Sequence, residues 1–214
     1  KVLDLSNRLS GAWAARLFGD FGAEVILAEG HEGHIARQLS PKYQGKDSQE
    51  SLVHQFVNWN KYSSSQDAKE IKELIACADI VITTDSIPQI DSSEIDAIHL
   101  SFTAHGLTGP WSNIPGNDLT HSANSGWAMI NKYENEEPLQ LPTNQPSFIA
   151  GVAGFVAASA ALHRGSKELI DVSELEATAL TCVPWAIMGI FIGGDRLQFG
   201  PNRRKTRGRP GPLW

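Results

Sequence analysis

The chain has 214 residues, which is enough for one large domain with a buried core or for two small domains. A hydrophobic content of 41% with 20% charged residues is typical of a soluble globular protein. The formal net charge of −6 argues against a general nucleic-acid-binding role. The most apolar run, Phe148 to Leu162, is predicted to be too short and too rich in small residues to span a bilayer, and no signal-peptide pattern is visible.

The two cysteines, Cys77 and Cys182, are far apart and each lies in an apolar stretch with helical character. Buried free thiols are predicted for such positions, and they favour a reducing, cytoplasmic location. The chain begins at Lys1 instead of a methionine and ends at Trp214 in a segment rich in proline and glycine. We therefore expect it to be part of a longer protein.

The beginning of the chain predicts a strand, a helix and a second strand. Val2 to Leu5 and Ala23 to Leu27 are short apolar runs of strand type. Between them, apolar residues recur at three- and four-residue spacing, which predicts a helix with Ser10 as N-cap and a stop at Gly22. The apolar face of this helix is predicted to consist of Trp13, Leu17, Phe18 and Phe21.

The turn into this helix lies where α/β folds bind ligands. In a crossover between parallel strands, the helix begins near the carboxyl edge of the sheet. A dinucleotide site would have the pattern G-x-G-x-x-G at this turn, but residues 8 to 13 contain only Gly11. An ordinary NAD site is therefore excluded, and both another ligand and a purely structural crossover remain open.

The rest of the chain continues the alternation of helices and strands. Residues 30 to 66 form a polar stretch with three histidines, predicted as a long loop over the sheet edge. Helices are predicted at 67–77, 92–95, 118–130, 147–164 and 174–191, and strands at 79–84, 97–103 and 168–172. This pattern predicts one doubly wound α/β domain with a predominantly parallel sheet at residues 1–194, followed by a basic linker rich in proline and glycine at 195–214.

Several motifs run in one order through nearly the whole chain. They are VLDLS with LSGAWAARLFGDFGAEVILAE at the start, then GHIAR, NWNK, HGLTGPW, GNDLTHSANSG, and finally AALHR followed by IDVSELEA. Together they resemble the family III CoA-transferases, the group that includes formyl-CoA transferase, carnitine CoA-transferase and α-methylacyl-CoA racemase. The resemblance implies a Rossmann-like large domain that takes CoA and acyl-CoA as substrates, with no tightly bound cofactor and no metal site.

CoA is expected at the carboxyl edge of the sheet, beside Gly11, Arg37, Lys61 and Gly109. CoA is polyanionic at one end, so its site needs cations and backbone donors. Arg37 and Lys61 match basic positions of the motifs, and Gly109 belongs to a glycine-rich loop that allows close approach of a ligand. The alternatives are solvated surface cations and an ordinary tight turn.

The resemblance also implies a catalytic aspartate at the start of the small-residue helix. In the family this carboxylate attacks the thioester to form a mixed anhydride, or moves a proton in the racemases. Alignment on Ala150 and Gly151 places Ser147 at this position, and no register supplies an acid. The racemases also use a histidine next to an aspartate, and here Asn117 precedes Asp118. Asp118 and Ser147 are therefore the candidate catalytic residues, with helix N-terminal and capping roles as the alternatives.

Two functions remain open at this stage. One is a domain that acts on or binds acyl-CoA thioesters, and the other is a catalytically degenerate CoA-transferase domain with a structural or partner-binding role, as one half of a tandem protein. The missing aspartate favours the second. A homodimer or a second domain is the expected partner, with no nucleic acid and no membrane. The basic cluster Arg203 to Arg209 is interpreted as part of a solvated linker, with a phosphate- or nucleic-acid-binding module as the alternative.

Overall fold

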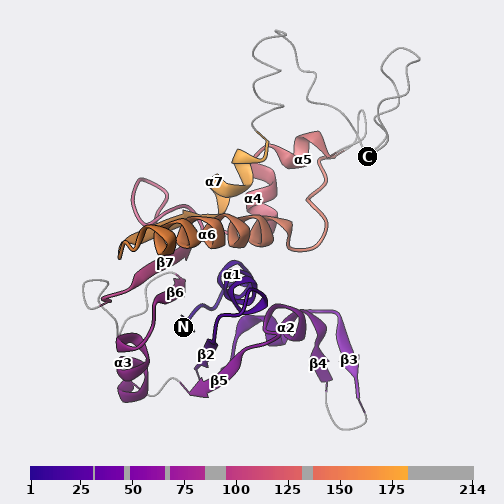
Figure 1. Cartoon of the computed structure of the whole chain (residues 1–214). Helices are drawn as coiled ribbons and strands as arrows, with labels where there is room; N and C mark the ends of the chain where they lie inside the picture. Colours follow the sequence, from indigo (N-terminus) through magenta and orange to yellow (C-terminus); the bar gives the residue numbers. More distant parts are fainter. Residues whose placement is uncertain (31, 46–48, 66–67, 85–94, 132–136, 183–214) are drawn as a thin grey trace.

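A six-stranded parallel sheet forms the centre of the domain. The computed structural model describes residues 1–30, 32–45, 49–65, 68–84, 95–131 and 137–182 (Figure 1). The strand order is β5-β2-β1-β6-β7-β8, and every neighbouring pair runs parallel. The strands are β1 (Val2–Asp4), β2 (Val25–Glu29), β5 (Tyr62–Ser65), β6 (Ile80–Thr84), β7 (Ile98–Thr103) and β8 (Leu169–Ser173). The predicted doubly wound α/β fold is therefore confirmed.

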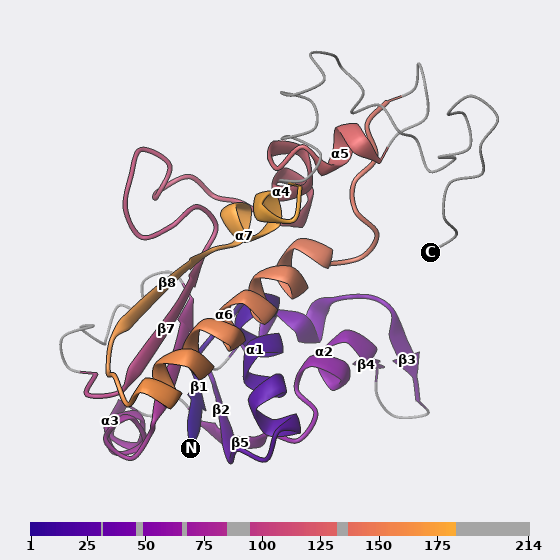
Figure 2. The same cartoon turned by 45° about the horizontal axis from the view of Figure 1, so that its top comes forward.

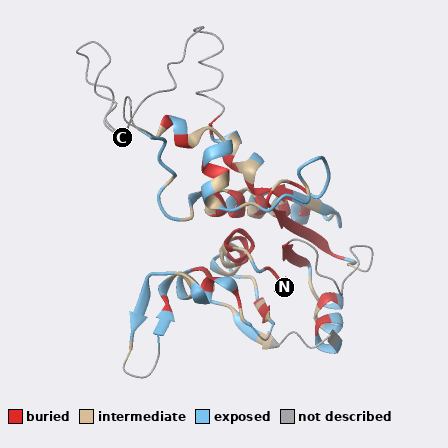
Figure 3. Ribbon diagram, turned by 180° about the vertical axis from the view of Figure 1, so that it is seen from behind, coloured by how far each residue is buried: buried red, intermediate tan, exposed pale blue. Residues whose placement is uncertain are grey.

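Helices cover both faces of this sheet. On one face α1 (Leu9–Asp20) and α6 (Gln145–Arg164) lie side by side, and α3 (Ala68–Ala76) lies on the other (Figure 2). The central strands β6 and β7 are buried throughout because each face of the sheet is covered, although β7 carries the polar residues His99, Ser101 and Thr103 (Figure 3). One apolar core lies between the sheet and the helices α1 and α6, and another lies between the sheet and α3. A smaller apolar cluster joins Leu9 and Ala12 of α1 to Ala36 and Val57.

The face of α1 that packs against α6 and the sheet is made mainly of small residues, which corrects the sequence prediction. Of the four predicted apolar residues only Phe18 is buried, and Phe21 is 79% exposed. The helix begins at Leu9, with Arg8 as N-cap residue, so Ser10 is not the cap. Large side chains could not occupy this face because α6 approaches too closely. The buried residues of α1 are Leu9, Ser10, Gly11, Ala12, Ala14, Ala15 and Phe18.

The predicted long loop at 30–66 contains regular structure. A short 3-10 helix (Ile35–Gln38) leads to the hairpin of β3 (Lys42–Gln44) and β4 (Gln49–Ser51), then to α2 (Leu52–Val57) and to the edge strand β5. The loop prediction is therefore wrong for much of this stretch. The sequence of β5, Tyr62-Ser-Ser-Ser65, has no apolar alternation because an edge strand with one partner needs little buried surface.

Three other predictions need adjustment. The helix expected at 118–130 is two helices, α4 (Asp118–Asn124) and α5 (Trp127–Ile130), separated at Gly126, whose φ is +91°. Cys182 is buried as predicted, whereas Cys77 is exposed. Helix α7 (Glu174–Leu180) begins where expected. The helix predicted at 92–95, the end of the helix predicted at 174–191 and the basic linker fall outside the described residues.

Helix α6 has the length and composition of a membrane-spanning helix. The prediction that its apolar run is too short to span a bilayer is therefore wrong. In the structure one side of α6 packs against α1, β7 and β8. This is the arrangement of a core helix in an α/β domain. The residues of its buried side are Pro146, Ser147, Ala150, Gly151, Gly154, Ala158 and Ala161.

We predict that Gly151→Ala destabilises the fold. A Cβ atom at Gly151 would lie 2.7 Å from the Ser10 carbonyl oxygen and 2.8 Å from Trp13 Cδ1, so α6 would have to move away from α1. Overpacking of this kind costs about 1–3 kcal/mol. Gly19→Ala in α1 is the matched control, because its Cβ would meet nothing closer than 3.4 Å. Urea unfolding should show a lower free energy of unfolding for Gly151→Ala and no decrease for Gly19→Ala. Equal stability of the two variants would contradict the close packing of α6 against α1.

Candidate functional site

A cavity of about 470 Å³ opens at the carboxyl ends of the strands. Its walls come from the segments that follow β1, β2, β7 and β8, together with the start of α6. Parallel strands bring the segments after their carboxyl ends to one edge, so residues far apart in the sequence meet here. The lining residues are Asn7, Arg8, Leu9, Ile35, Leu39, Gly116, Asn117, Asp118, Asn144, Ser147 and Glu174.

The two candidate catalytic residues are in direct contact in this cavity. The backbone N–H and the hydroxyl of Ser147 both donate to Asp118 Oδ1, at 2.8 and 2.9 Å. The side-chain amide of Asn144 donates to Asp118 Oδ2 at 2.8 Å. Asp118 is half-buried and Ser147 is 6% exposed. The carboxylate is therefore held in one orientation at the cavity wall.

Local sequence explains how Asp118 comes to this place. It is the first residue of α4, whose N-terminus is fixed by a capping box between Asn117 and Thr120. The N-cap residue of α6, Asn144, makes no side-chain capping bond to its own helix. Asp118 supplies that bond from a different helix when it accepts the Ser147 N–H. The predicted capping role of Ser147 is wrong, because its hydroxyl bonds to Asp118 and not to its own helix.

This contact changes the interpretation of the missing family aspartate. The sequence supplies no acid at the family's aspartate position in any register, and it places no base beside Ser147. The structure places a carboxylate 2.9 Å from the Ser147 hydroxyl, contributed by Asp118. An ionised carboxylate at a cavity wall can act as a nucleophile toward an acyl carbon or as a base.

A buried ion pair, which sequence reasoning missed, forms another part of the wall. Arg8 Nη1 donates to Glu174 Oε2 at 2.8 Å, and the Ser10 hydroxyl donates to Glu174 Oε1 at 2.6 Å. The Glu174 side chain is only 1% exposed and that of Arg8 is 20% exposed. Arg8 also donates to the Gly116 carbonyl oxygen. A glutamate directly after the buried end of a strand was the available signal in the sequence.

Two histidines near the cavity, His105 after β7 and His121 in α4, do not line it. His121 is fully buried, and its Nδ1 lies 3.4 Å from Glu174 Oε2. Burial, together with the nearby Arg8 charge, lowers the pKa of His121 to about 4. The ring is therefore neutral near pH 7. His105 packs edge-on against His121 and hydrogen-bonds the Ile114 carbonyl oxygen.

Lys61, a predicted CoA-binding cation, is buried and fully engaged. Its ammonium is 1% exposed and donates to Asp4 Oδ2, the Ala12 carbonyl oxygen and Asn58 Oδ1 at 2.8, 2.9 and 2.7 Å. Burial lowers the pKa of Lys61, while the Asp4 carboxylate opposes this shift. Three donors with three acceptors leave the ammonium no hydrogen for a phosphate unless the Asp4 contact breaks.

The other three predicted CoA-binding residues also lie outside the cavity lining. Arg37 is half-exposed and forms an ion pair with both carboxylate oxygens of Glu29. Gly11 is packed so tightly that an added Cβ would lie 2.4 Å from Ser6 Cβ. Gly109 has a φ of +98° and open space beside it. Their roles in CoA binding, and that of Lys61, stay predictions.

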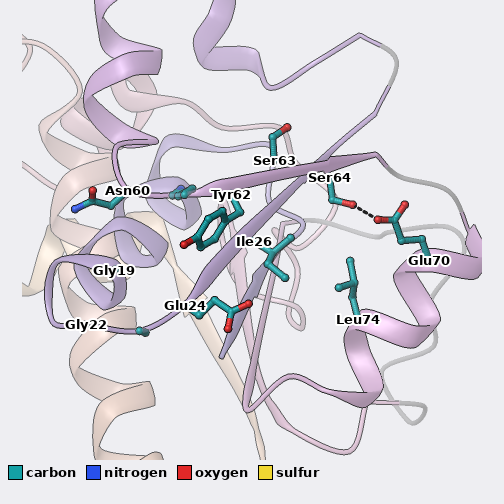
Figure 4. Close-up of a pocket in the computed structure, with 12 residues that line it drawn as sticks. Gly19, Gly22, Glu24, Ile26, Asn60, Tyr62, Ser63, Ser64, Glu70 and Leu74 are labelled. Carbon is teal, nitrogen blue, oxygen red and sulfur yellow. Dashed lines mark hydrogen bonds between the residues drawn. The ribbon is translucent and has the colours of Figure 1, made fainter.

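A second, larger hollow of about 950 Å³ lies at the amino ends of β2 and β5. Figure 4 shows Glu24, Tyr62 and Glu70 around it, with the Ser64 hydroxyl donating to Glu70. Lys61 also lines this hollow, but its ammonium is engaged by three acceptors, so the two carboxylates make it a poor site for the phosphates of CoA.

We predict that Lys61→Met strongly destabilises the protein. The change leaves the Asp4 carboxylate buried without its cation, and breaking a buried ion pair in this way costs about 3–5 kcal/mol. Lys167→Met is the matched control, because Lys167 pairs with Asp96 on the surface and such a pair contributes only about 0–1 kcal/mol. Chemical denaturation of both variants checks this, and similar losses would show that the Asp4–Lys61 pair is not buried.

We also predict that stability falls as the pH falls between 6.5 and about 4. Burial lowers the pKa of His34 from 6.5 to about 4, although the Asp4 carboxylate opposes the shift. The unfolded chain therefore binds a proton in this range that the folded chain does not, which favours unfolding as the pH decreases. His34 Nδ1 also accepts the Ala36 N–H, and an asparagine oxygen can take over this role. His34→Asn should make the pH dependence of thermal stability shallower, and an unchanged slope would contradict this assignment.

Comparison with known proteins identifies the family of the chain. Residues 1–208 match the model of CoA-transferase family III. The chain is 30% identical over 214 residues to human succinyl-CoA:glutarate CoA-transferase, covering 90% of this chain and 48% of that protein. It is 27% identical to the BbsE subunit of succinyl-CoA:(R)-benzylsuccinate CoA-transferase from Thauera aromatica, covering 84% of this chain and 49% of that subunit.

The fold is also found in solved structures. A CAIB/BAIF family protein from Brucella suis superimposes with a TM-score of 0.83 at 22% identity, covering 90% of this chain and 57% of that chain. The chain thus spans about half the length of the curated relatives that it matches. With a family match that covers nearly all of its residues, the chain belongs to CoA-transferase family III.

Proposed function

We propose that this chain is the acyl-CoA-binding domain of a CoA-transferase, and that Asp118 supplies the reacting carboxylate. The observation that carries the proposal is the contact between Asp118 and Ser147 in the cavity at the carboxyl edge. Ser147 occupies the position where the family has its aspartate, so the Asp118 carboxylate lies one hydrogen bond away from it. The names of the relatives, which transfer CoA from succinyl-CoA, support a thioester as substrate.

The chemistry follows from the groups at the cavity wall. An oxygen of Asp118 attacks the thioester carbon, a C–O bond forms, the C–S bond breaks, and CoA leaves as a thiolate with the electron pair of that bond. The product on the protein is a mixed anhydride. In the full transfer cycle the acyl group of the donor ends as a free carboxylate, and the acceptor carboxylate ends as the new CoA thioester. Atoms and charges balance without a further reactant.

Ser147 and Asn144 act as positioning residues in this proposal. Their hydrogen bonds to the two Asp118 oxygens fix the direction in which the carboxylate faces the cavity. Such orientation favours a near-attack geometry for the thioester. Leu9, Ile35 and Leu39 form an apolar part of the lining, which suits the hydrocarbon of an acyl group.

A specific observation favours the alternative, a degenerate domain that binds CoA without transfer. Asp118 accepts the Ser147 N–H at the start of α6 and so has a structural use of its own. A carboxylate that serves only as a helix cap would leave the cavity without a nucleophile. In that case the domain would contribute binding surface or structure to a second domain or a second chain.

We predict that Asp118→Asn abolishes acyl capture by the protein. Acyl-CoA added to the unchanged protein should release free CoA, and borohydride should trap the anhydride by reducing the side chain of Asp118, which mass spectrometry detects in the peptide. Ser147→Ala keeps the carboxylate and should weaken capture by roughly tenfold to a hundredfold, a loss of orientation. Asp20→Asn, the same chemical change at an exposed residue of α1, is the control and should have no effect.

Two results would decide between the candidate functions. CoA binding without thiol release, together with activity gained in Ser147→Asp, would support the degenerate domain. Thiol release that persists in Asp118→Asn would contradict the role of Asp118 and point to another nucleophile.

A further inference from the structure

The acyl cavity contains more negative than positive charge. Among the described residues that line it, the only charged ones are Arg8, Asp118 and Glu174. One guanidinium therefore faces two carboxylates. Glu174 Oε2 lies 2.8 Å from Arg8 Nη1 and compensates its charge, and only 1% of the Glu174 side chain is exposed.

The excess of negative charge in the lining disfavours a substrate with a free carboxylate at the far end of its acyl group. A carboxylate that leaves water for a partly buried site needs a cation or several donors, because desolvation otherwise costs more than the contact returns. The Arg8 guanidinium is the only cation in the described lining, and its Nη1 is committed to Glu174 while Nη2 donates to the Gly116 carbonyl oxygen. A third carboxylate, brought by the substrate, would be repelled by Asp118. It would also have to compete with Glu174 for the Arg8 guanidinium.

We infer that the cavity selects acyl groups without charge, in contrast to the carboxylated succinyl group named for the relatives, and that Glu174 is the residue that determines this selectivity. The inference rests on the proposed function, because it describes the acyl group that would reach Asp118. Glu174 neutralises Arg8 and so prevents Arg8 from acting as a receptor for a second carboxylate. The apolar residues Leu9, Ile35 and Leu39 form the part of the lining that would contact the hydrocarbon chain, and the remaining uncharged lining residues are Asn7, Gly116, Asn117, Asn144 and Ser147.

The Ser10 hydroxyl strengthens this arrangement from a second element. It donates to Glu174 Oε1 at 2.6 Å, while Arg8 occupies Oε2, so both oxygens of the carboxylate are held. Ser10 is fully buried on α1 and Glu174 is the first residue of α7. Both hydrogen bonds join the start of α1 to the start of α7. Glu174 therefore cannot rotate away from Arg8 without losing its bonds to both Arg8 and Ser10.

The test compares two CoA thioethers that cannot transfer an acyl group. S-butyl-CoA and S-(3-carboxypropyl)-CoA have four carbons each beyond the sulfur and differ in the terminal carboxylate. Calorimetry on the unchanged protein should show that S-butyl-CoA binds at least about tenfold more tightly. Because neither ligand reacts, the comparison holds whether or not Asp118 forms an anhydride.

Variants assign the selectivity to Glu174. Glu174→Gln keeps the shape and leaves the Arg8 charge uncompensated, so the preference should fall below about threefold or reverse. Glu176→Gln, two residues further along α7 and outside the cavity lining, should leave it unchanged. Arg8→Gln removes the cation and should increase the preference for S-butyl-CoA, which provides a second readout if Glu174→Gln does not fold.

The inference would be overturned if the carboxylated ligand bound as tightly as S-butyl-CoA to the unchanged protein. It would also be overturned if Glu174→Gln folded and kept the original preference. Failure of both ligands to bind, with the protein folded by circular dichroism, would remove the acyl site itself and with it the proposed function.

Discussion

The hydrogen bonds that Asp118 accepts at the start of α6 hold the candidate site together. They join α4 to α6, between which α5 lies in the sequence. They also give the N-terminal N–H groups of α6 an acceptor that the N-cap residue of α6 does not provide. The same bonds aim a carboxylate at a cavity. One interaction thus stabilises a helix end and orients a reactive group, so the structural and the catalytic roles of Asp118 rest on the same contact.

The position of this interaction depends on the parallel sheet. All strands of the main sheet run in one direction, so the segments after their carboxyl ends meet at one edge and bring Arg8, Asp118 and Glu174 to one cavity. Close packing of α1 against α6 through glycine and alanine lets the starts of both helices contribute to it. Lys61 is part of this scaffold as well, because its pair with Asp4 fixes the end of β1 under the site.

Charge then decides what the cavity can accept. Arg8 and Glu174 compensate each other in a buried pair, so the remaining charge of the described lining is that of Asp118. A buried ion pair contributes little to stability compared with apolar residues of similar size. We therefore attribute the role of this pair at the cavity wall to the selection of the acyl group. The apolar residues of the lining complete a site for an acyl group that carries no charge.

Much of the fold could be predicted from the sequence, because the signals were local. The buried strand β6 begins with an apolar run and β7 alternates apolar with polar residues, and helix starts and stops are marked by glycine and capping residues. Two kinds of feature could not be predicted. The edge strand β5 has no apolar pattern, and the small-residue face of α1 is dictated by a helix that lies more than a hundred residues further along the chain.

The site was predictable only in part for the same reason. Asp118 and Ser147 were identified as candidates from the order of the family's motifs, but their contact is tertiary and no spacing reveals it. Arg8 and Glu174 pair across 166 positions, so neither could be assigned a partner from sequence. Lys61 matched a motif for a cation, yet its environment is a buried carboxylate that only the fold brings to it.

The most direct test of the account is a crystal structure of the protein with S-butyl-CoA bound. The account predicts that the butyl group occupies the cavity at the carboxyl edge, with the first carbon after the sulfur about 3–3.5 Å from an oxygen of Asp118. A butyl group in the hollow at the amino ends of β2 and β5, or one that lies in solvent while Asp118 contacts only α6, would contradict it.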